Sequence, residues 1–263
     1  MVSTDFKNAR QEPKKGVNEA ECQTLAGQLV QLIVTGSDVI ESFREITPIS
    51  TDLQEYLDAI TNLKEGHLAD ETGALKPQLD FYLQLESACQ SYSDKPKLWM
   101  DALGLIVELA FLLLMRKKYP NSETKVYHEH TVEIMIAGNK FTMVPKPIDV
   151  IMWSDPAEQG EFLEIKKDLD AKIEPVEGER ADAFISKVGR MYDLLVFLAE
   201  NGMEKTPVGL ATLSSNPGAT YLIEITLRAA GKLDVGASLA SLQHQLTVIT
   251  SANLMDWYSR KVV

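Results

Sequence analysis

The stretch that decides the fold reads PIDVIMWSDPAEQGEFLEIK and spans residues 147–166. Its two ends are rich in apolar β-formers and are separated by the polar turn residues at 154–156, so we predict two strands joined by a turn. Successive side chains of a strand point to opposite faces of the sheet. Asp149 therefore faces away from the apolar residues beside it, and Glu164 shares a face with Lys166. Two carboxylates and one ammonium are expected to meet where these strands lie side by side.

Upstream of this stretch the sequence predicts a long helix and a β-hairpin. Residues 98–118 are strongly apolar and end in three cations, which suit the negative end of a helix. Glu108 lies in the middle of that apolar run, where a carboxylate requires a metal, a cation or hydrogen-bond donors. We weigh a metal contact for Glu108 against a pair with a core lysine or arginine. Residues 126–136, the turn Gly138-Asn139 and the extended residues that follow are typical of a hairpin.

Downstream, we predict a helix over 180–201, a strand over 208–213, a last strand over 246–250 and a short helix around Trp257. The pattern of residues 221–230 is compatible with either strand or helix. The order helix, hairpin, strand, helix, strand indicates an α/β fold in which helices flank a mixed sheet.

The N-terminal part of the chain is predicted to be helical. Residues 17–98 carry apolar positions at helical spacing, and 64–76 is the clearest loop among them. We therefore divide the chain into an N-terminal helical region, 1–97, whose first 16 residues form a flexible tail, and an α/β core, 98–263. The tail has no apolar run of a signal peptide or anchor. The apolar stretch 102–115 is too short to span a bilayer, so we expect no membrane segment.

The amino-acid composition limits which kinds of partner the protein is expected to bind. The formal net charge is −12 and the pI is about 4.9, which weighs against a general nucleic-acid coating protein. Acidic metal ligands, however, add negative charge that a bound cation offsets. The two cysteines lack metal-ligand spacing and fit a reducing, cytoplasmic setting. His128 and His130 flank Glu129, and we interpret them as exposed or substrate-facing side chains, since no third ligand stands at a telling spacing.

The central motif resembles that of the PD-(D/E)XK, or restriction-endonuclease-like, nuclease superfamily. The resemblance lies in Ile148-Asp149 followed by Glu164-Ile165-Lys166, and in element order it covers about 98–213. The proline stands two positions before the aspartate instead of one. The resemblance implies a restriction-endonuclease-like core in which Asp149, Glu164 and Lys166 are catalytic. It also implies Mg²⁺, with Mn²⁺ as a possible substitute, as cofactor. The implied metal ligands are Glu108, Asp149, Glu164 and the backbone carbonyl of Ile165, and the candidate substrate contacts are Lys187, Arg190 and Lys167, with Lys172 and Arg180 as further candidates.

The function that follows from the resemblance is metal-dependent phosphodiester hydrolysis. We expect a DNA endonuclease of restriction or defence type that acts as a homodimer, because double-strand cleavage requires paired sites. One alternative is a catalytically silent nuclease-fold protein that serves as a binding or assembly module. Another is an unrelated acidic α/β protein, in which Asp149 and Glu164 would lie far apart.

Overall fold

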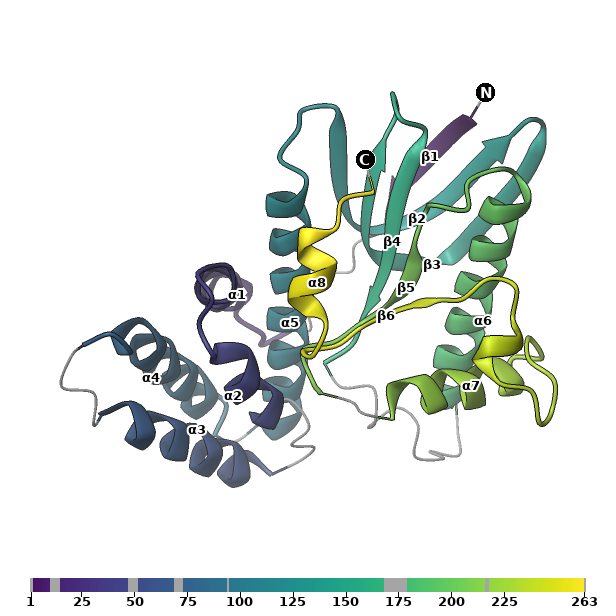
Figure 1. Ribbon diagram of the computed structural model, residues 1–263. Coiled ribbons are helices and arrows are strands. Elements are labelled where there is room, and N and C mark those ends of the chain that lie inside the picture. The colour runs from purple at the N-terminus through teal and green to yellow at the C-terminus, as the bar shows by residue number, and fades with distance from the viewer. Residues whose placement is uncertain are drawn as a thin grey trace.

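The centre of the molecule is a mixed sheet of six strands, and Figure 1 shows the helices arranged around it. The computed structural model describes residues 2–9, 15–46, 52–68, 73–93, 95–167, 179–215 and 218–262. In spatial order the strands are β1 (Val2–Asn8), β2 (Thr124–Ile136), β3 (Asn139–Ser154), β4 (Gln159–Ile165), β5 (Val208–Ala211) and β6 (Thr247–Ile249). Strands β1 to β4 pair antiparallel, whereas β4, β5 and β6 pair parallel. The predicted α/β fold with helices flanking a mixed sheet is confirmed.

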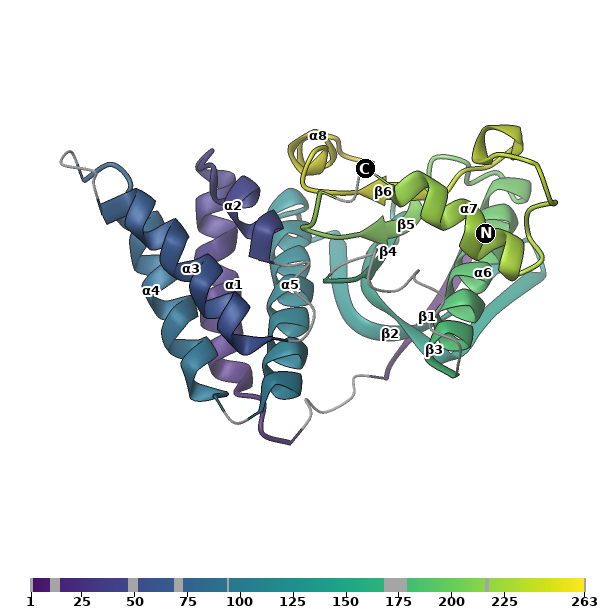
Figure 2. The same ribbon diagram turned by 90° about the horizontal axis from the view of Figure 1, so that it is seen from below.

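Helices cover both faces of the sheet and extend outward on one side. Helices α5 (Pro96–Lys118) and α8 (Leu254–Ser259) pack on one face, and α6 (Glu179–Glu200) and α7 (Ala219–Ala229) lie on the other (Figures 1 and 2). A short 3₁₀ turn, η2 (Leu239–Ser241), follows α7. The outer helices are α1 (Glu19–Val34), α2 (Val39–Ile46), α3 (Leu53–Leu68) and α4 (Lys76–Ser91). Figure 2 shows α5 between α1 and the sheet, so α5 is covered on both sides.

Two apolar clusters hold these layers together, one on each face of the sheet. The first cluster joins α1, α4 and α5 to the sheet through residues such as Leu29, Phe81 and Leu163, each at most 1% exposed. The second cluster lies between the sheet and α6 and α7, around Phe162 and Leu194. The first cluster contains residues from both sides of the boundary that the sequence suggested between residues 97 and 98. The helical region and the α/β part therefore share one core.

The N-terminal tail is not flexible over its whole length, and that prediction is wrong for Val2–Asn8. These residues form β1 along the edge of the sheet, paired with β2 from Val2 opposite Ile136 to Asn8 opposite His130. The ring of Phe6 anchors the strand, since its centroid lies 4.9 Å from that of Tyr127. The gain from this aromatic contact and from the β2 hydrogen bonds explains why a polar segment is ordered.

Two further expectations need correction. The predicted loop at 64–76 begins too early, because α3 continues to Leu68 and α4 begins at Lys76. The ambiguous stretch 221–230 lies in α7, with Ile223 and Leu227 buried on one side as helical spacing requires.

Helix α5 is long and apolar enough to cross a membrane by length and composition alone, contrary to the expectation that this stretch is too short. In the structure 61% of its apolar window is buried inside the protein, between α1 and the sheet. This burial is what the core helix of a layered fold requires, so the apolar character of α5 is accounted for by packing.

Candidate carboxylate and lysine site

The predicted acids and lysine come together at the end of β4. In the β3–β4 ladder Val150 pairs with Leu163, and this register sets Asp149 beside Glu164. Lys166 follows directly after the last residue of β4. The period-two pattern of both strands thus brings the three side chains to one place, as the sequence predicts.

The ammonium of Lys166 lies among three oxygen atoms. Its Nζ is 2.8 Å from the carbonyl oxygen of Ile165 and 3.5 Å from Oδ2 of Asp149, and it donates to Oε1 of Glu164. Oδ2 of Asp149 also accepts the backbone N–H of Ile165 at 2.7 Å. The oxygens that the sequence suggests as metal ligands on these residues therefore converge on one cationic nitrogen.

Lys187 of α6 closes the other side of the cluster. Its Nζ lies 3.3 Å from Oδ1 of Asp149 and forms an ion pair with Oε2 of Glu164. Each carboxylate thus faces two ammonium groups. Lys187 was expected to contact substrate. In the structure its ammonium contacts the carboxylates of Asp149 and Glu164.

Burial and charge set the protonation of the cluster. Glu164 is fully buried, and its pKa is raised by that burial and by the neighbouring Asp149, against the effect of the two lysines. Burial also opposes ionisation of Asp149, but Lys166, Lys187 and the Ile165 N–H together lower the pKa of Asp149 to about 2. For Lys166, burial is outweighed by the attraction of both carboxylates, and its pKa lies above the ordinary value. The ionised Asp149 and the two ammonium groups therefore hold the cluster together, whereas Glu164 binds a proton more readily than an ordinary glutamate does.

Glu108 of α5 does not join the two strand acids in one ligand set. Its Oε1 contacts Nε2 of His128 on β2. Among the described residues, the ligand atoms of Glu108, His128 and Glu129 all lie within 4.8 Å of one another and could hold a metal ion, whereas Asp149 and Glu164 stand outside this set. Glu108 still acts on the main cluster, because its charge raises the pKa of Lys166. Glu108 was expected to contact either a metal or a core lysine or arginine. The structure gives it a histidine as its partner.

The two histidines have different surroundings because β2 is irregular between them. Glu129 has a left-handed φ of 51°, and the β2–β3 register shifts just beyond His130. The side chain of His128 is 10% exposed and contacts Glu108, so of the two possibilities given for the histidines, exposed or substrate-facing, exposure is wrong for His128. His130 instead lies 5.1 Å from the ring of Tyr127, and its Nδ1 is 2.7 Å from the carbonyl oxygen of His128.

The remaining predicted contacts diverge from the cluster. Arg190 reaches the β2–β3 hairpin, where it donates to the Thr142 carbonyl and lies over Phe141, so the structure does not bring it to the carboxylates. Lys167 turns toward α3, and its Nζ is 3.2 Å from Oη of Tyr56. Lys172 and the side chain of Arg180 lie outside the described residues.

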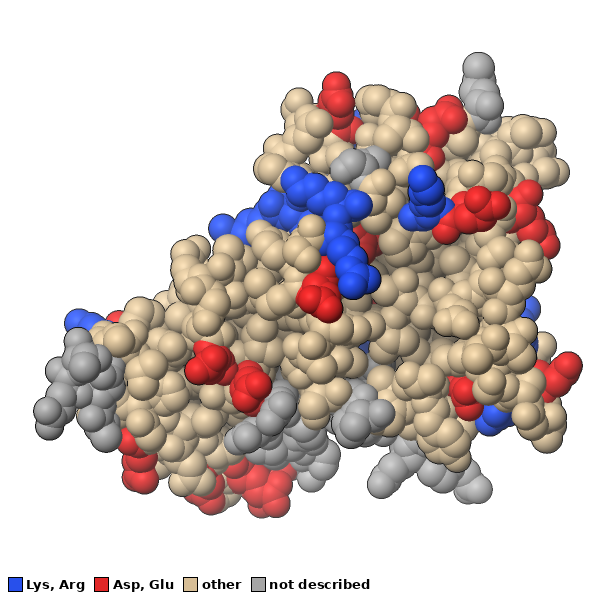
Figure 3. Space-filling model, in the orientation of Figure 1, with Lys and Arg blue, Asp and Glu red and all other residues tan. Residues whose placement is uncertain are grey.

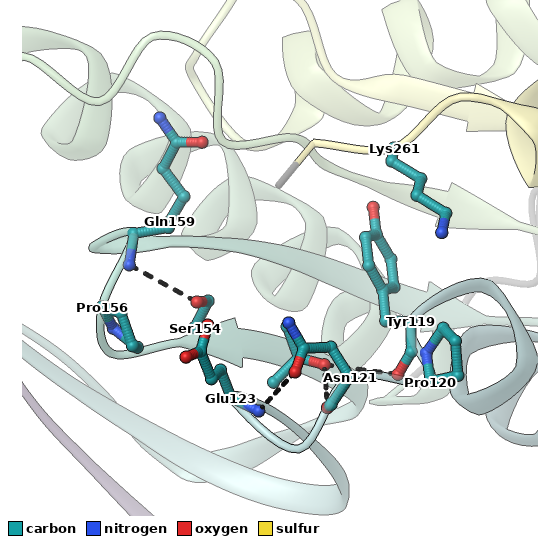
Figure 4. A pocket seen from close by; sticks show the side chains of 10 residues that line it. Tyr119, Pro120, Asn121, Glu123, Ser154, Pro156, Gln159 and Lys261 are labelled. Atoms are coloured by element: carbon teal, nitrogen blue, oxygen red, sulfur yellow. Dashed lines mark hydrogen bonds between the residues drawn. The ribbon is translucent and has the colours of Figure 1, made fainter.

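Two cavities lie at the opposite end of β4 and contain none of the predicted site residues. Figure 4 shows one of them, about 480 Å³ in volume, with Tyr119, Asn121 and Lys261 around it. The second, also about 480 Å³, is lined by Lys118 and Glu161, a buried ion pair with Nζ and Oε2 3.0 Å apart. Sequence reasoning missed this pair, although a glutamate on the apolar face of β4 could have signalled it.

Comparison with known proteins adds one weak structural likeness. No protein-family profile matches the sequence, and no curated protein matches it. Among solved structures, the crystal structure of protein VC1899 from Vibrio cholerae is similar with a TM-score of 0.36 and 9% sequence identity. The match covers 98% of this chain and 57% of that chain, so this chain spans little more than half the length of that protein. The function is therefore argued from the site itself.

Proposed function

We propose that this protein is a divalent-metal-dependent nuclease that hydrolyses phosphodiester bonds in DNA as an endonuclease of restriction or defence type. The observation that carries the proposal is the convergence of Asp149, Glu164 and Lys166 at the end of β4. Two acids and a lysine at one point are the residue types that metal-assisted phosphodiester cleavage needs. A restriction-endonuclease-like core and action as a homodimer belong to the same proposal.

The donor atoms suit Mg²⁺. Asp149, Glu164 and the Ile165 carbonyl offer hard oxygens, and these oxygens already surround a single positive charge, the Lys166 ammonium. Mg²⁺ prefers oxygens at about 2.0 to 2.1 Å, whereas Oδ2 of Asp149 lies 3.5 Å from the Lys166 Nζ, so cation binding at this point would draw the oxygens closer together. It would also require that the ammonium give up its position among the oxygens.

Each side chain then has a distinct part. Asp149, Glu164 and the Ile165 carbonyl would hold Mg²⁺, which would supply Lewis acidity toward the scissile phosphate. Lys166, which follows directly after β4, would stabilise the negative charge that develops on the phosphate or orient the attacking water. Lys187 keeps Asp149 and Glu164 in place through its contacts with both. Glu108 and His128 lie at the side of the cluster, where they offer an oxygen and a nitrogen for a further metal contact.

One observation favours the alternative of a silent binding or assembly module. Without metal, two carboxylates already meet two ammonium groups, so the cluster is charge-balanced and can serve as a structural ion-pair network. Such a network requires no substrate. The two functions differ in what substitutions at the cluster change.

The deciding experiment compares cleavage and metal binding in three variants. Supercoiled plasmid and circular single-stranded DNA are incubated with Mg²⁺ or Mn²⁺, and Mn²⁺ binding is measured by calorimetry. We expect D149N and K166M each to lower cleavage by about a hundredfold or more. D149N should also weaken Mn²⁺ binding, whereas K166M should preserve or strengthen it, because no ammonium competes for the oxygens.

The matched control is K140M, which removes a surface lysine paired with Glu133 and 51% exposed. It should cleave and bind Mn²⁺ as the wild type does. Wild-type rates in both D149N and K166M would refute the mechanism. Inactivity of the wild type on every substrate and with either metal would favour the silent module.

A further inference from the structure

The outer helices reach the site through Tyr56 of α3. The side chain of Lys167, the residue after Lys166, donates to Oη of Tyr56 at 3.2 Å. The same ammonium lies 5.9 Å from the centre of the Tyr56 ring. A residue of the helical region thus contacts the residue next to the central lysine of the site.

Tyr56 is held firmly against α5. It is 1% exposed, its Oη donates to Sδ of Met100 at 3.0 Å, and its ring meets that of Trp99 edge-on at 5.9 Å. Helix α5 also carries Glu108. Tyr56 is therefore packed against the same helix that carries Glu108.

The backbone after β4 is fixed from the other direction. The Lys166 N–H donates to the Ala211 carbonyl at 2.9 Å, and Oγ1 of Thr212 donates to the Lys167 carbonyl at 2.9 Å. The main chain of these lysines is thus bonded to the end of β5, while the Lys167 side chain is bonded to α3. Lys166 and Lys167 leave the strand toward different partners, one toward the carboxylates and one toward Tyr56.

We propose that Tyr56 is a positioning residue, which holds Lys167 and thereby the end of β4 so that Lys166 keeps its place beside Asp149 and Glu164. This inference rests on the proposed nuclease function for its effect on catalysis. It gives the helical region a role inside the site, in addition to any role in dimerisation or target recognition. It also means that Lys167 acts through the geometry of its neighbour and not as a direct phosphate contact.

The test uses Y56F, which removes the hydroxyl and keeps the ring. The matched control is Y92F, because Tyr92 is also a buried tyrosine of the helical region, packs on Trp99 at 5.9 Å, and accepts a hydrogen bond from the Asn18 N–H at 3.0 Å. We expect Y56F to lower kcat about tenfold at unchanged KM, as loss of a hydrogen bond to a charged group would. K167M should have the same effect, and the double variant should be no worse than either single one. Y92F should leave kcat and KM unchanged.

A second readout does not depend on catalysis. Hydrogen exchange of the Lys166 amide should be faster in Y56F than in the wild type and unchanged in Y92F. Equal exchange in Y56F and Y92F would overturn the inference even if the protein cleaves DNA. A rise in KM with a smaller salt dependence of DNA binding in K167M, at unchanged kcat, would overturn it in favour of a direct phosphate contact. If the wild type cleaves nothing, the nuclease proposal fails, and the exchange experiment still decides the role of Tyr56.

Discussion

The charge balance of the cluster predicts how two substitutions combine in their effect on stability. In the metal-free protein the carboxylates of Asp149 and Glu164 face the ammonium groups of Lys166 and Lys187. D149N leaves two ammonium groups with one carboxylate, and K187M leaves two carboxylates with one ammonium. The pKa of Asp149 is lowered in the folded protein, so its ionised form stabilises the fold at any pH above its ordinary pKa. The double variant D149N/K187M removes one charge of each sign and restores the balance.

The magnitude follows from the burial of these groups. Removal of one partner from a buried ion pair typically costs about 3 to 5 kcal/mol, because the other charge remains without compensation. The side chains of Lys166 and Lys187 keep 23% and 15% of their surface exposed, so water compensates part of this cost. We expect each single variant to lose about 2 kcal/mol and the double variant about 1 kcal/mol, a coupling free energy of about 3 kcal/mol.

The free energy of unfolding is measured by urea titration with a chelator present, at about pH 8 to favour the ionised carboxylates. The control is the surface pair of Lys232 and Asp193, whose Nζ and Oδ1 lie 2.7 Å apart but whose side chains are 31% and 35% exposed. The D193N/K232M cycle should show a coupling free energy below about 1 kcal/mol. The reasoning is refuted if the losses in D149N and K187M simply add in the double variant.

Two further predictions concern parts of the molecule outside the cluster. Burial raises the pKa of the Cys22 thiol to about 11 and that of the Cys89 thiol to about 12. Neither thiol should therefore react with Ellman's reagent at pH near 8 until urea unfolds the chain. Stoichiometric labelling of the native protein would contradict this packing. F6A should lower the free energy of unfolding by about 2 kcal/mol, less than a fully buried phenylalanine would, because Phe6 is half-buried beside Tyr127. The exposed K7A serves as its control, and equal stability of the two variants would mean that β1 does not pack through Phe6.

Local patterns sufficed to predict the central pair of strands and their acids. The runs of apolar residues indicated two strands buried on both faces, the period of two fixed which side chains share a face, and the short turn between the strands fixed their antiparallel pairing. Given both, Asp149 and Glu164 had to become neighbours, as the pairing of Val150 with Leu163 shows. The same reasoning found the hairpin but placed its turn one residue too late. The turn residues are Ala137 and Gly138, both with left-handed φ, and Asn139 already pairs with Ile136.

Contacts between distant segments could not be predicted in this way. Strand β1 is polar, and its partner β2 begins more than a hundred residues later in the chain, so no local pattern indicates the pairing. Glu108 and His128 meet because α5 packs over the part of β2 just before the irregularity at Glu129. That irregularity could not be predicted, because a left-handed φ at a residue other than glycine leaves no clear mark in the sequence. The contact of Tyr56 with Lys167 likewise depends on how α3 packs against α5.

The acidic character of the whole chain and the proposed action on DNA are compatible if the cation changes the sign of the site. The net charge is −12, and basic side chains on the face shown in Figure 3 gather mainly toward α8 and the end of α5. With both carboxylates ionised, the cluster of Asp149, Glu164, Lys166 and Lys187 is neutral, so without metal it exerts little attraction on a phosphate. Under the proposed function, a divalent cation held by these oxygens would add two positive charges, and Asp149, Glu164, Lys166 and Lys187 together would present a positive centre. If the protein is a nuclease as proposed, tight binding of the DNA backbone would then depend on the metal and would be confined to the site of cleavage, although the chain as a whole is acidic.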